Sequence, residues 1–281
     1  MQKPVLRFAP SPNGLLHLGH AYSALFTALW AEHLGGRFLL RIEDTDITRS
    51  KPEFTVAIFE DLQWLGLDWE RPVMRQSERF DIYAAQAERL KRRDLLYPCF
   101  CTRTEMATAS AGTDPDGAPL YPGTCRHLSH VEIRQRFAEG RDVQWRLKTD
   151  EAMALTGMLT YTVAAPTPID RPQIRYARPE RWGDVVLQRK GTPTSYHLSV
   201  VIDDDAQGIT HVTRGRDMEP STDIHVLLQM LLGLRSPVYT FHKLILDDEG
   251  RKLSKSKGSA SLRSLREAGR TPAEIRRQLG F

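Results

Sequence analysis

Hydrophobic residues near the start of the chain switch between runs typical of strands and repeats typical of helices. A short apolar run at 4–8 leads into a segment rich in proline and glycine at 10–14, which predicts a strand followed by a loop. Apolar positions at 19–34 recur at helical spacing, with a glycine pair to end the helix. The run at 38–42 predicts a second strand, and the acidic residues of 43–46 stand at its carboxyl end.

The same alternation continues further along the chain. Amphipathic spacing predicts helices at 53–67 and 80–96. The stretch 106–124 is rich in small and polar residues and predicts an exposed loop within an inserted module. Polar segments at 143–148 and 158–163 predict strands. The order of strands and helices favours a parallel α/β sheet.

The sheet is expected to resume after the insertion. An apolar run at 198–202, which ends in three aspartates, predicts a strand, and 223–233 predicts a helix. Beyond Gly250 the sequence predicts a basic loop and one or two short helices. We therefore expect an α/β, doubly wound parallel (Rossmann-type) core in two halves, 1–98 and 183–240, with an inserted module at 99–182 and a C-terminal segment at 241–281.

Composition places the chain among ordinary globular proteins. Of its 281 residues, 41% are hydrophobic and 26% are charged, which is unlike a disordered or a membrane chain. No run approaches the ~20 apolar residues of a spanning helix, and the N-terminus has no apolar signal-peptide region, so we expect a cytoplasmic protein. The net charge is only +4, yet 251–281 is strongly basic. Such a tail suits phosphates or RNA, although a solvated helical face would have the same composition.

Two segments far apart in the sequence have nucleotide chemistry. His17-Leu18-Gly19-His20 stands where the first loop enters the first helix, so two imidazoles lie one turn apart beside unpaired backbone N–H groups. Gly19 would let a nucleotide approach closely. Alone, such histidines could simply cap or pack the helix. Lys252 and Lys255 belong to a glycine-bounded segment and could close over a triphosphate, neutralising the charge that develops as pyrophosphate leaves.

Three motifs in order resemble the class I aminoacyl-tRNA synthetases of the glutamyl and glutaminyl branch: Arg-Phe-Ala-Pro-Ser-Pro-Asn-Gly at 7–14, His-Leu-Gly-His at 17–20 and Lys-Leu-Ser-Lys-Ser at 252–256. The resemblance spans essentially the whole chain. It implies a ligase-type enzyme that activates glutamate with ATP and Mg²⁺. It also implies that His17, His20, Lys252 and Lys255 are catalytic, and that ATP is held by His17, Gly19, His20 and Lys255.

A glutamate pocket requires an anion for the ammonium group and cations for the side-chain carboxylate, and Glu43 and Arg7 have those charges. The motifs at 41–46 and 196–215 resemble the family's substrate segments, which assigns Glu43 to the amino group and Tyr196 and Arg214 to glutamate. Two arginines without an opposing carboxylate would favour an anionic side chain over glutamine. Val200 stands where full-length glutamyl enzymes have asparagine. The expected glutamate-binding residues are Arg7, Ala9, Ser11, Glu43, Tyr196 and Arg214.

Cys99, Cys101 and Cys125 fall within one short window, and three thiolates this close suit a structural zinc ion with a fourth protein ligand. By chemistry alone His127 is the preferred fourth ligand, whereas the resemblance implies Tyr121. The alternative is three buried free cysteines. We expect one zinc ion per chain, holding the inserted module.

Little sequence follows the lysine–serine motif, so we expect no anticodon-binding domain. A glutamyl-type catalytic half with this cysteine spacing resembles the stand-alone paralogues of glutamyl-tRNA synthetase. This implies transfer of glutamate to queuosine in the anticodon of tRNA(Asp) by a monomer that contacts no membrane. The alternatives are a truncated enzyme that charges a tRNA 3′ end, a non-catalytic RNA-binding paralogue, or a nucleotidyltransferase that shares the His-x-Gly-His motif.

Overall fold

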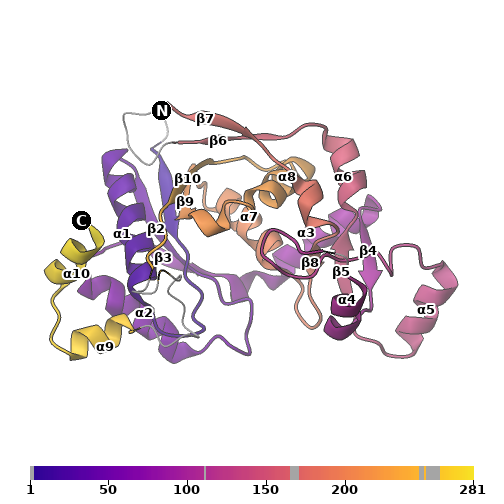
Figure 1. Cartoon of the computed structure of the whole chain (residues 1–281), viewed down its shortest axis with the longest axis horizontal. Helices are drawn as coiled ribbons and strands as arrows, with labels where there is room; N and C mark the ends of the chain where they lie inside the picture. Colours follow the sequence, from indigo (N-terminus) through magenta and orange to yellow (C-terminus); the bar gives the residue numbers. More distant parts are fainter. Residues whose placement is uncertain (1–2, 111, 165–170, 247–249, 251–259) are drawn as a thin grey trace.

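The computed structural model describes residues 3–110, 112–164, 171–246, 250 and 260–281. Across those ranges, no helix combines the length and apolar character needed to cross a membrane. Figure 1 shows the chain as a row of three parts: an N-terminal sheet with its helices, a central layer of helices and strands, and a small sheet at the far end.

The N-terminal part is a parallel sheet in the order β1-β2-β3, formed by β1 (Val5–Phe8), β2 (Arg37–Ile42) and β3 (Glu70–Arg75). The helices α1 (Leu18–His33) and α2 (Pro52–Trp64) connect these strands. One face of α1 buries its aromatic and aliphatic residues in the core below the sheet. The expected strand–loop–helix–strand–helix order of this region is confirmed.

A second sheet continues beside the first in the order β7-β6-β10-β9. Its strand β10 is parallel to both neighbours, whereas β7 is antiparallel to β6. The two sheets meet where the N–H of Thr210 donates to the carbonyl of Val5 over 3.0 Å. The parallel core is therefore confirmed, with one antiparallel strand at its edge. Its strands are β6 (Thr160–Val163), β7 (Gln173–Tyr176), β9 (His211–Gly215) and β10 (Val238–His242).

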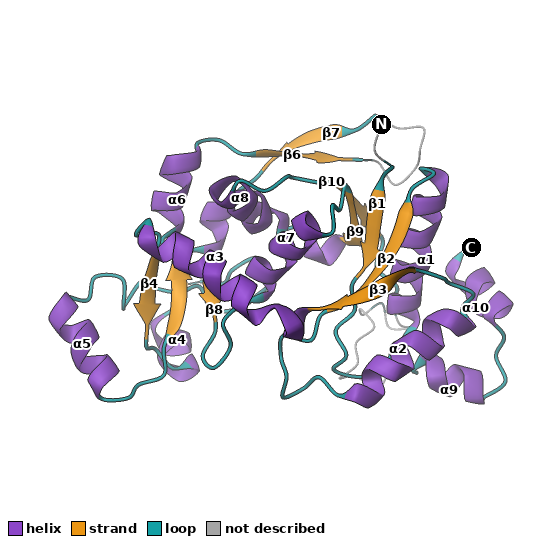
Figure 2. Ribbon diagram, turned by 180° about the vertical axis from the view of Figure 1, so that it is seen from behind, coloured by secondary structure: helices purple, strands orange, loops and turns teal. Residues whose placement is uncertain are grey.

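The strand that we expected at 198–202 is wrong. These residues belong to α7 (Tyr196–Ala206), in which Leu198 to Asp204 are all buried. Sequence periodicity cannot distinguish a helix buried on every side from a buried strand, and the β-branched residues at 200–202 favour the latter. The correction puts Asp203 and Asp204 on a helix that lies against the sheet (Figure 2).

Two other helices cover the same region. The helix predicted at 223–233 is confirmed as α8 (Thr222–Leu232). The helix predicted at 80–96 is α3 (Phe80–Arg92), but its last residues belong to a strand, because the chain turns at Arg93 and Asp94. Asp94 has a positive φ of 55°, which ends helical geometry. Short 3₁₀ turns lie at Gln76–Arg79, Pro179–Trp182 and Arg216–Met218.

The third part is a separate antiparallel sheet in the order β4-β5-β8. The predicted loop at 106–124 is partly wrong, because Thr102 and Glu105 form a capping box that starts a helix reaching Ala109. The strands predicted at 143–148 and 158–163 are confirmed as β5 and β6. The elements of this part are β4 (Leu96–Cys99), β5 (Gln144–Leu147), β8 (Val186–Gln188), α4 (Arg103–Ala109), α5 (His130–Ala138) and α6 (Thr149–Thr156).

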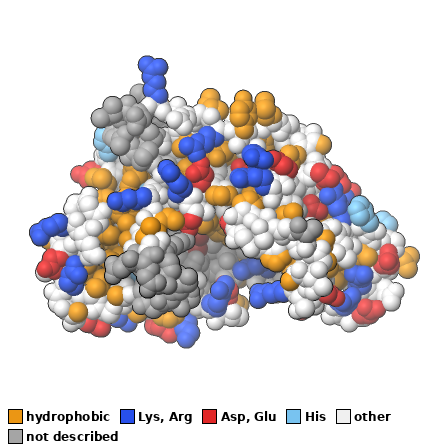
Figure 3. Space-filling view, in the orientation of Figure 1, with side chains coloured by type: hydrophobic (Ala, Val, Ile, Leu, Met, Phe, Trp, Pro, Cys, Tyr) orange, Lys and Arg blue, Asp and Glu red, His pale blue; other side chains and the backbone are white. Residues whose placement is uncertain are grey.

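The expected boundaries of the inserted module, 99–182, do not coincide with the boundaries of the sheets. Within 99–182, β6 pairs with β10 of the second sheet and β7 pairs with β6, whereas β8 lies after residue 182 and pairs with β5. Along the upper edge in Figure 3, apolar side chains gather over β6 and β7, and Ile174 is 73% exposed there. The domain boundaries stay a prediction.

The C-terminal segment packs back on the first part. Helices α9 (Leu262–Glu267) and α10 (Pro272–Leu279) lie against α1 and α2 (Figure 1). Leu262, Ile275 and Leu279 are buried in the same core as α1. The prediction of short helices after the basic loop is confirmed.

Candidate active site

A cavity of about 670 Å³ opens at the carboxyl ends of the parallel strands β1, β2, β9 and β10. This edge is where open parallel sheets bind ligands. Every predicted ATP- or glutamate-binding residue that the structure describes lines the cavity. These residues are Arg7, Ala9, Ser11, His17, Gly19, His20, Glu43, Tyr196 and Arg214. Lys252 and Lys255 lie outside the described residues.

The two histidines of the first motif cap the start of α1. His17 is the N-cap, and its Nδ1 accepts from the N–H of Gly19 over 3.1 Å. The Nδ1 of His20 accepts in turn from the N–H of His17 over 3.2 Å. The N–H groups that we expected to be unpaired are thus partly satisfied by the imidazoles themselves. The two ring centroids lie 3.9 Å apart, and both histidines line the cavity.

Gly19 is needed for this arrangement as well as for any nucleotide. A Cβ at this position would come within 3.0 Å of the Cε1 atom of His17. A side chain would therefore push the His17 ring off its capping position. The sequence predicted that Gly19 leaves room for a nucleotide, but not that it also leaves room for the His17 ring.

The chain on both sides of the lysine–serine motif is anchored at the cavity. Before the motif, Lys243 and Ile245 line the cavity. After it, Ser261 forms an antiparallel bridge with His17, and the N–H of Leu262 donates to the carbonyl of Leu16 over 2.7 Å. The described chain therefore lines the cavity before the motif and is bonded to the start of α1 after it.

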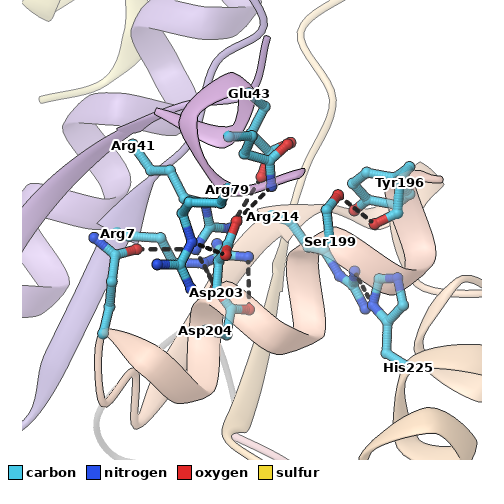
Figure 4. Close-up of polar contacts among 12 residues, drawn as sticks. Arg7, Arg41, Glu43, Arg79, Tyr196, Ser199, Asp203, Asp204, Arg214 and His225 are labelled. Atoms are coloured by element: carbon cyan, nitrogen blue, oxygen red, sulfur yellow. Dashed lines mark hydrogen bonds and ion pairs between the residues drawn. The ribbon is translucent and has the colours of Figure 1, made fainter. Parts of the chain in front are cut away.

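Arg7 does not face the cavity as an unopposed cation. Its Nε and Nη2 atoms donate to the two oxygens of Asp204 over 2.8 and 3.2 Å (Figure 4). The fully buried Arg41 donates to the same Asp204 over 2.7 Å and to Glu43 over 2.9 Å. The expectation that Arg7 lacks an opposing carboxylate is therefore wrong, because α7 brings Asp204 to the sheet.

Burial and the arginines act in opposite directions on the pKa values of these acids. Burial raises the pKa of Glu43 above its usual range, although Arg41 and Arg7 oppose the shift. For Asp204 the burial effect is outweighed by Arg7 and Arg41, so its pKa is lowered. Glu43 lines the cavity and can accept an ammonium group, whereas Asp204 is occupied by two arginines.

A second buried acid fixes the neighbouring turn. Asp203 accepts from Arg79 over 2.8 Å, from Gln76 over 2.8 Å and from the hydroxyl of Tyr83 over 2.7 Å. Sequence reasoning missed these partners of Asp203. The run of three aspartates gave a signal for acidic residues near the site, but no sequence pattern indicated Gln76 or Tyr83.

Arg214 differs from the other arginines of the site. Its Nη1 contacts the Nδ1 of His225 at 3.1 Å, and its Nη2 donates to the hydroxyl of Thr222. The guanidinium lies over the rings of Tyr239 and Phe241, with centroids 5.1 and 5.7 Å away. Within the described ranges no acidic side chain forms an ion pair with Arg214. Its positive charge is thus available to a ligand in the cavity.

Tyr196 and Val200 lie one turn apart near the start of α7 but have different surroundings. Tyr196 lines the cavity, and its ring centroid is 5.4 Å from that of His225. Val200 is buried in the large core and does not line the cavity. The replacement of asparagine by valine therefore changes the packing behind the pocket.

The three cysteines converge in the antiparallel part, whose strands β4 and β5 lie at the opposite end of the molecule from β1 and β2 (Figures 1 and 2). Their sulfur atoms all lie within 4.8 Å of one another, and the hydroxyl of Tyr121 is 3.7 Å from the Sγ of Cys101. His127 is exposed and stands outside the cluster. The geometry therefore favours Tyr121 over His127 as the fourth group.

The surroundings of the sulfurs fit a metal-bound thiolate cluster. The N–H of Phe100 donates to the Sγ of Cys125, and the amide of Gln144 donates to the Sγ of Cys99, each over 3.5 Å. Donors of this kind stabilise negative charge on sulfur, and three sulfurs with one oxygen can surround a tetrahedral ion.

Comparisons with known proteins agree with this geometry. Residues 4–280 match the family model described as tRNA synthetases class I (E and Q), catalytic domain. The chain is 46% identical to the glutamyl-Q tRNA(Asp) synthetase of Rhodobacter capsulatus, over 99% of this chain and 100% of the relative. It is 40% identical to the glutamate–tRNA ligase of Aquifex aeolicus, over 98% of this chain but only 56% of the relative.

A solved structure agrees in fold. The crystal structure of a glutamate tRNA ligase from Elizabethkingia meningosepticum in complex with its amino acid superposes with a TM-score of 0.71 and 34% identity. The superposition covers 92% of this chain and 53% of that one, so the chain spans about half the length of such ligases. With the two described motifs at one sheet edge and a family match along nearly its whole length, the chain belongs to the class I tRNA synthetases of the glutamyl and glutaminyl family, which are ligase-type enzymes.

Proposed function

We propose that the protein activates glutamate with ATP and transfers it to queuosine in the anticodon loop of tRNA(Asp). The observation that supports the amino acid is Arg214, a buried cavity cation without an acidic partner among the described residues. A carboxylate side chain would satisfy this charge, whereas a neutral amide would leave it buried and uncompensated.

In the proposed complex, the side-chain carboxylate of glutamate binds Arg214 and its ammonium group binds Glu43. Both residues line the cavity together with Tyr196. Arg7 and Arg41 are held by Asp204, and Arg41 in turn holds Glu43 in place. The α-carboxylate then points toward the start of α1, where ATP would lie.

The first step is an in-line attack of the α-carboxylate oxygen on the α-phosphorus of ATP. A new P–O bond forms, pyrophosphate leaves, and glutamyl-adenylate results. The start of α1 favours negative charge, and His17 and His20 hold the backbone there in a fixed conformation. The chain after the lysine–serine motif is bonded to this point by Ser261 and Leu262. Lys252 and Lys255 of the motif would neutralise the departing pyrophosphate together with Mg²⁺.

In the second step, a hydroxyl of the queuosine ring attacks the activated carbonyl, and AMP leaves. No side chain of the described part of the cavity stands out as a base for this hydroxyl. We therefore assign the proton to the phosphate of the adenylate itself.

Two observations support queuosine as the acceptor: the lengths of the relatives and the position of the cysteine cluster. The relative that matches this chain from end to end is named a glutamyl-Q tRNA(Asp) synthetase, whereas the glutamate–tRNA ligases extend well beyond the matched region. On the proposed division of the chain, Cys99, Cys101, Tyr121 and Cys125 hold one structural zinc ion in the part that meets the RNA.

The test combines ATP–pyrophosphate exchange with transfer of labelled glutamate to individual purified tRNAs. We expect exchange with glutamate and not with glutamine, and label on tRNA(Asp) that contains queuosine. Queuosine-free tRNA(Asp) is the matched control and should stay unlabelled. The His20→Ala enzyme should fail in both assays.

A minimal anticodon stem-loop distinguishes the proposal from 3′-end charging. A queuosine-containing stem-loop of tRNA(Asp) should accept glutamate without the rest of the tRNA. Label that instead appears on tRNA(Glu), and disappears after periodate destroys its 3′-terminal diol, would identify a truncated ligase. Binding of RNA without any exchange would identify a non-catalytic paralogue.

A further inference from the structure

We propose that His225 and His197 are positioning residues that hold Arg214 through neutral hydrogen bonds and so make the cavity select glutamate over glutamine. The inference rests on the proposed glutamate site and goes beyond it, because neither histidine lines the cavity.

The three side chains form a continuous chain of contacts behind the pocket. The Nη1 of Arg214 lies 3.1 Å from the Nδ1 of His225, and the Nε2 of His225 lies 3.3 Å from the Nδ1 of His197. His225 is only 2% exposed. Thr222, one helical turn before His225 on α8, accepts from the other terminal nitrogen of Arg214. Figure 4 shows Arg214 and His225 joined in this way beside Tyr196.

The direction of these hydrogen bonds follows from the charge of arginine. A guanidinium can only donate, so the Nδ1 of His225 must accept and carry no proton. Neutral His225 then has its proton on Nε2, which donates to the Nδ1 of His197. The proton of His197 is consequently on its own Nε2. One arginine therefore sets the tautomers of two histidines in succession.

The groups around this chain keep both histidines neutral. Burial, followed by the Arg214 cation, lowers the pKa of His197 to about 4 and that of His225 well below its usual value. Trp182 and Tyr196 face His197, with ring centroids at 5.4 and 5.5 Å. No carboxylate contacts either imidazole within the described ranges.

The other arginines of the site are held differently. Arg7 and Arg41 donate to Asp204, and Arg79 donates to Asp203, so their charges are balanced by the protein. Arg214 is also fixed by two partners, but these are a hydroxyl and an imidazole. Its Nε atom is buried without a hydrogen-bond partner. Fixing an arginine with neutral acceptors keeps its orientation while leaving its whole charge for the substrate.

Three substitutions at one position separate charge from packing. His225→Gln retains a neutral acceptor and should keep the KM for glutamate within about threefold of the wild type. His225→Leu removes the acceptor and should raise this KM about 10-fold to 100-fold, with kcat of exchange nearly unchanged. His225→Glu places a carboxylate on Arg214 and should reduce the preference for glutamate over glutamine at least about tenfold.

A purely structural role for His225 would give equal effects in the Gln and Leu enzymes, and this result would overturn the proposal. Full glutamate preference in a folded His225→Glu enzyme would do the same. Thr222→Val, which is nearly isosteric and removes the second neutral acceptor, provides an independent test if His225→Glu does not fold. It should raise the KM for glutamate without changing that for ATP, and an unchanged KM would count against the proposal.

Controls keep this test distinct from that of the proposed function. His211→Leu changes a histidine on the same strand as Arg214 that lies outside the cavity and contacts Thr210, so its KM for glutamate should not change. Absence of glutamate-dependent exchange in the wild-type enzyme would reject the proposed function itself. Exchange that is normal in the wild type and equal in all His225 variants would reject only the positioning role.

Discussion

The cavity region and the cysteine-containing part are stabilised by different kinds of interaction. Around the cavity, two large hydrophobic cores pack against the parallel strands, and buried acids hold three arginines in place. One of these cores also takes in Leu96, Leu147 and Leu187 of the antiparallel sheet. In the antiparallel part, α4 and α5 have no buried residue. Its own core consists of Tyr97, Cys99, Phe100, Cys101, Tyr121 and Cys125.

This difference shows where hydrophobic packing alone can fix charged groups and where a metal ion is needed as well. A large core gives the strand ends defined positions, so buried ion pairs can be aligned on them. The small core has three sulfurs among its six residues, and aliphatic burial contributes little to it. We therefore expect the cysteine-containing end of the antiparallel part, around 99–127, to depend on sulfur–metal bonds and the cavity region to be independent of them.

The largest effect should come from removing a cysteine. Cys125→Ser should abolish binding of one zinc ion per chain and open the part around 99–127 to protease, since metal binding contributes on the order of 10 kcal/mol in small zinc sites. Glutamate-dependent exchange should persist, because the cavity lies on another core. Elemental analysis of protein purified without chelator, with limited proteolysis, checks both statements. If the wild-type chain contains no zinc, the cysteine-containing part does not depend on sulfur–metal bonds, and the proposed difference from the cavity region is wrong.

The opposite result is expected for a lysine of the lysine–serine motif. Lys255→Ala should lower the rate of adenylate formation about 10²-fold to 10³-fold while leaving glutamate binding nearly intact, because its charge is needed as pyrophosphate departs. Lys257→Ala is the matched control in the same segment. The zinc content should be unchanged in both. Equal losses in glutamate affinity and rate would show that Lys255 acts in the ground state.

Acid should weaken the cavity region through the histidines behind the pocket. Because the pKa of His197 is about 4 in the folded protein and near 6.5 when unfolded, the unfolded chain takes up the proton first. Stability is therefore retained above pH 6.5 and lost as the pH falls toward 4. This histidine alone should cost about 2 kcal/mol between pH 7.5 and 5.0. Urea unfolding at several pH values should show that the free energy of unfolding falls less steeply with decreasing pH in His197→Gln than in the wild type. An equal fall in the two proteins would contradict a lowered pKa for His197.

The smallest effect concerns the fourth group of the cysteine cluster. Tyr121→Phe removes the hydroxyl that lies 3.7 Å from Cys101 and should weaken zinc binding about tenfold, without abolishing it. Competition with a chromogenic chelator measures this change. His127→Ala is the control and should bind as the wild type does, because His127 is exposed. The reverse order of the two affinities would make His127 the ligand.

Much of the cavity could be predicted because its parts are local. The histidine motif, the glycine between its imidazoles and the acid after β2 all depend on a strand end or a helix start, which the sequence reveals through periodicity and turn residues. The partners of the arginines could not be predicted in this way. Arg7 and Asp204 are joined across most of the chain, and nothing near either residue in the sequence indicates the other.

The sequence by itself determined the family motifs, the parallel core and the clustering of the cysteines, since each follows from residue type and short-range spacing. Only the tertiary structure decided that 196–206 is a helix and that Asp204 opposes Arg7. It also decided that neutral side chains of α8 hold Arg214. The physical reason is that a fully buried segment has no amphipathic period, and that charge pairing depends on which elements pack together after the sheets have formed.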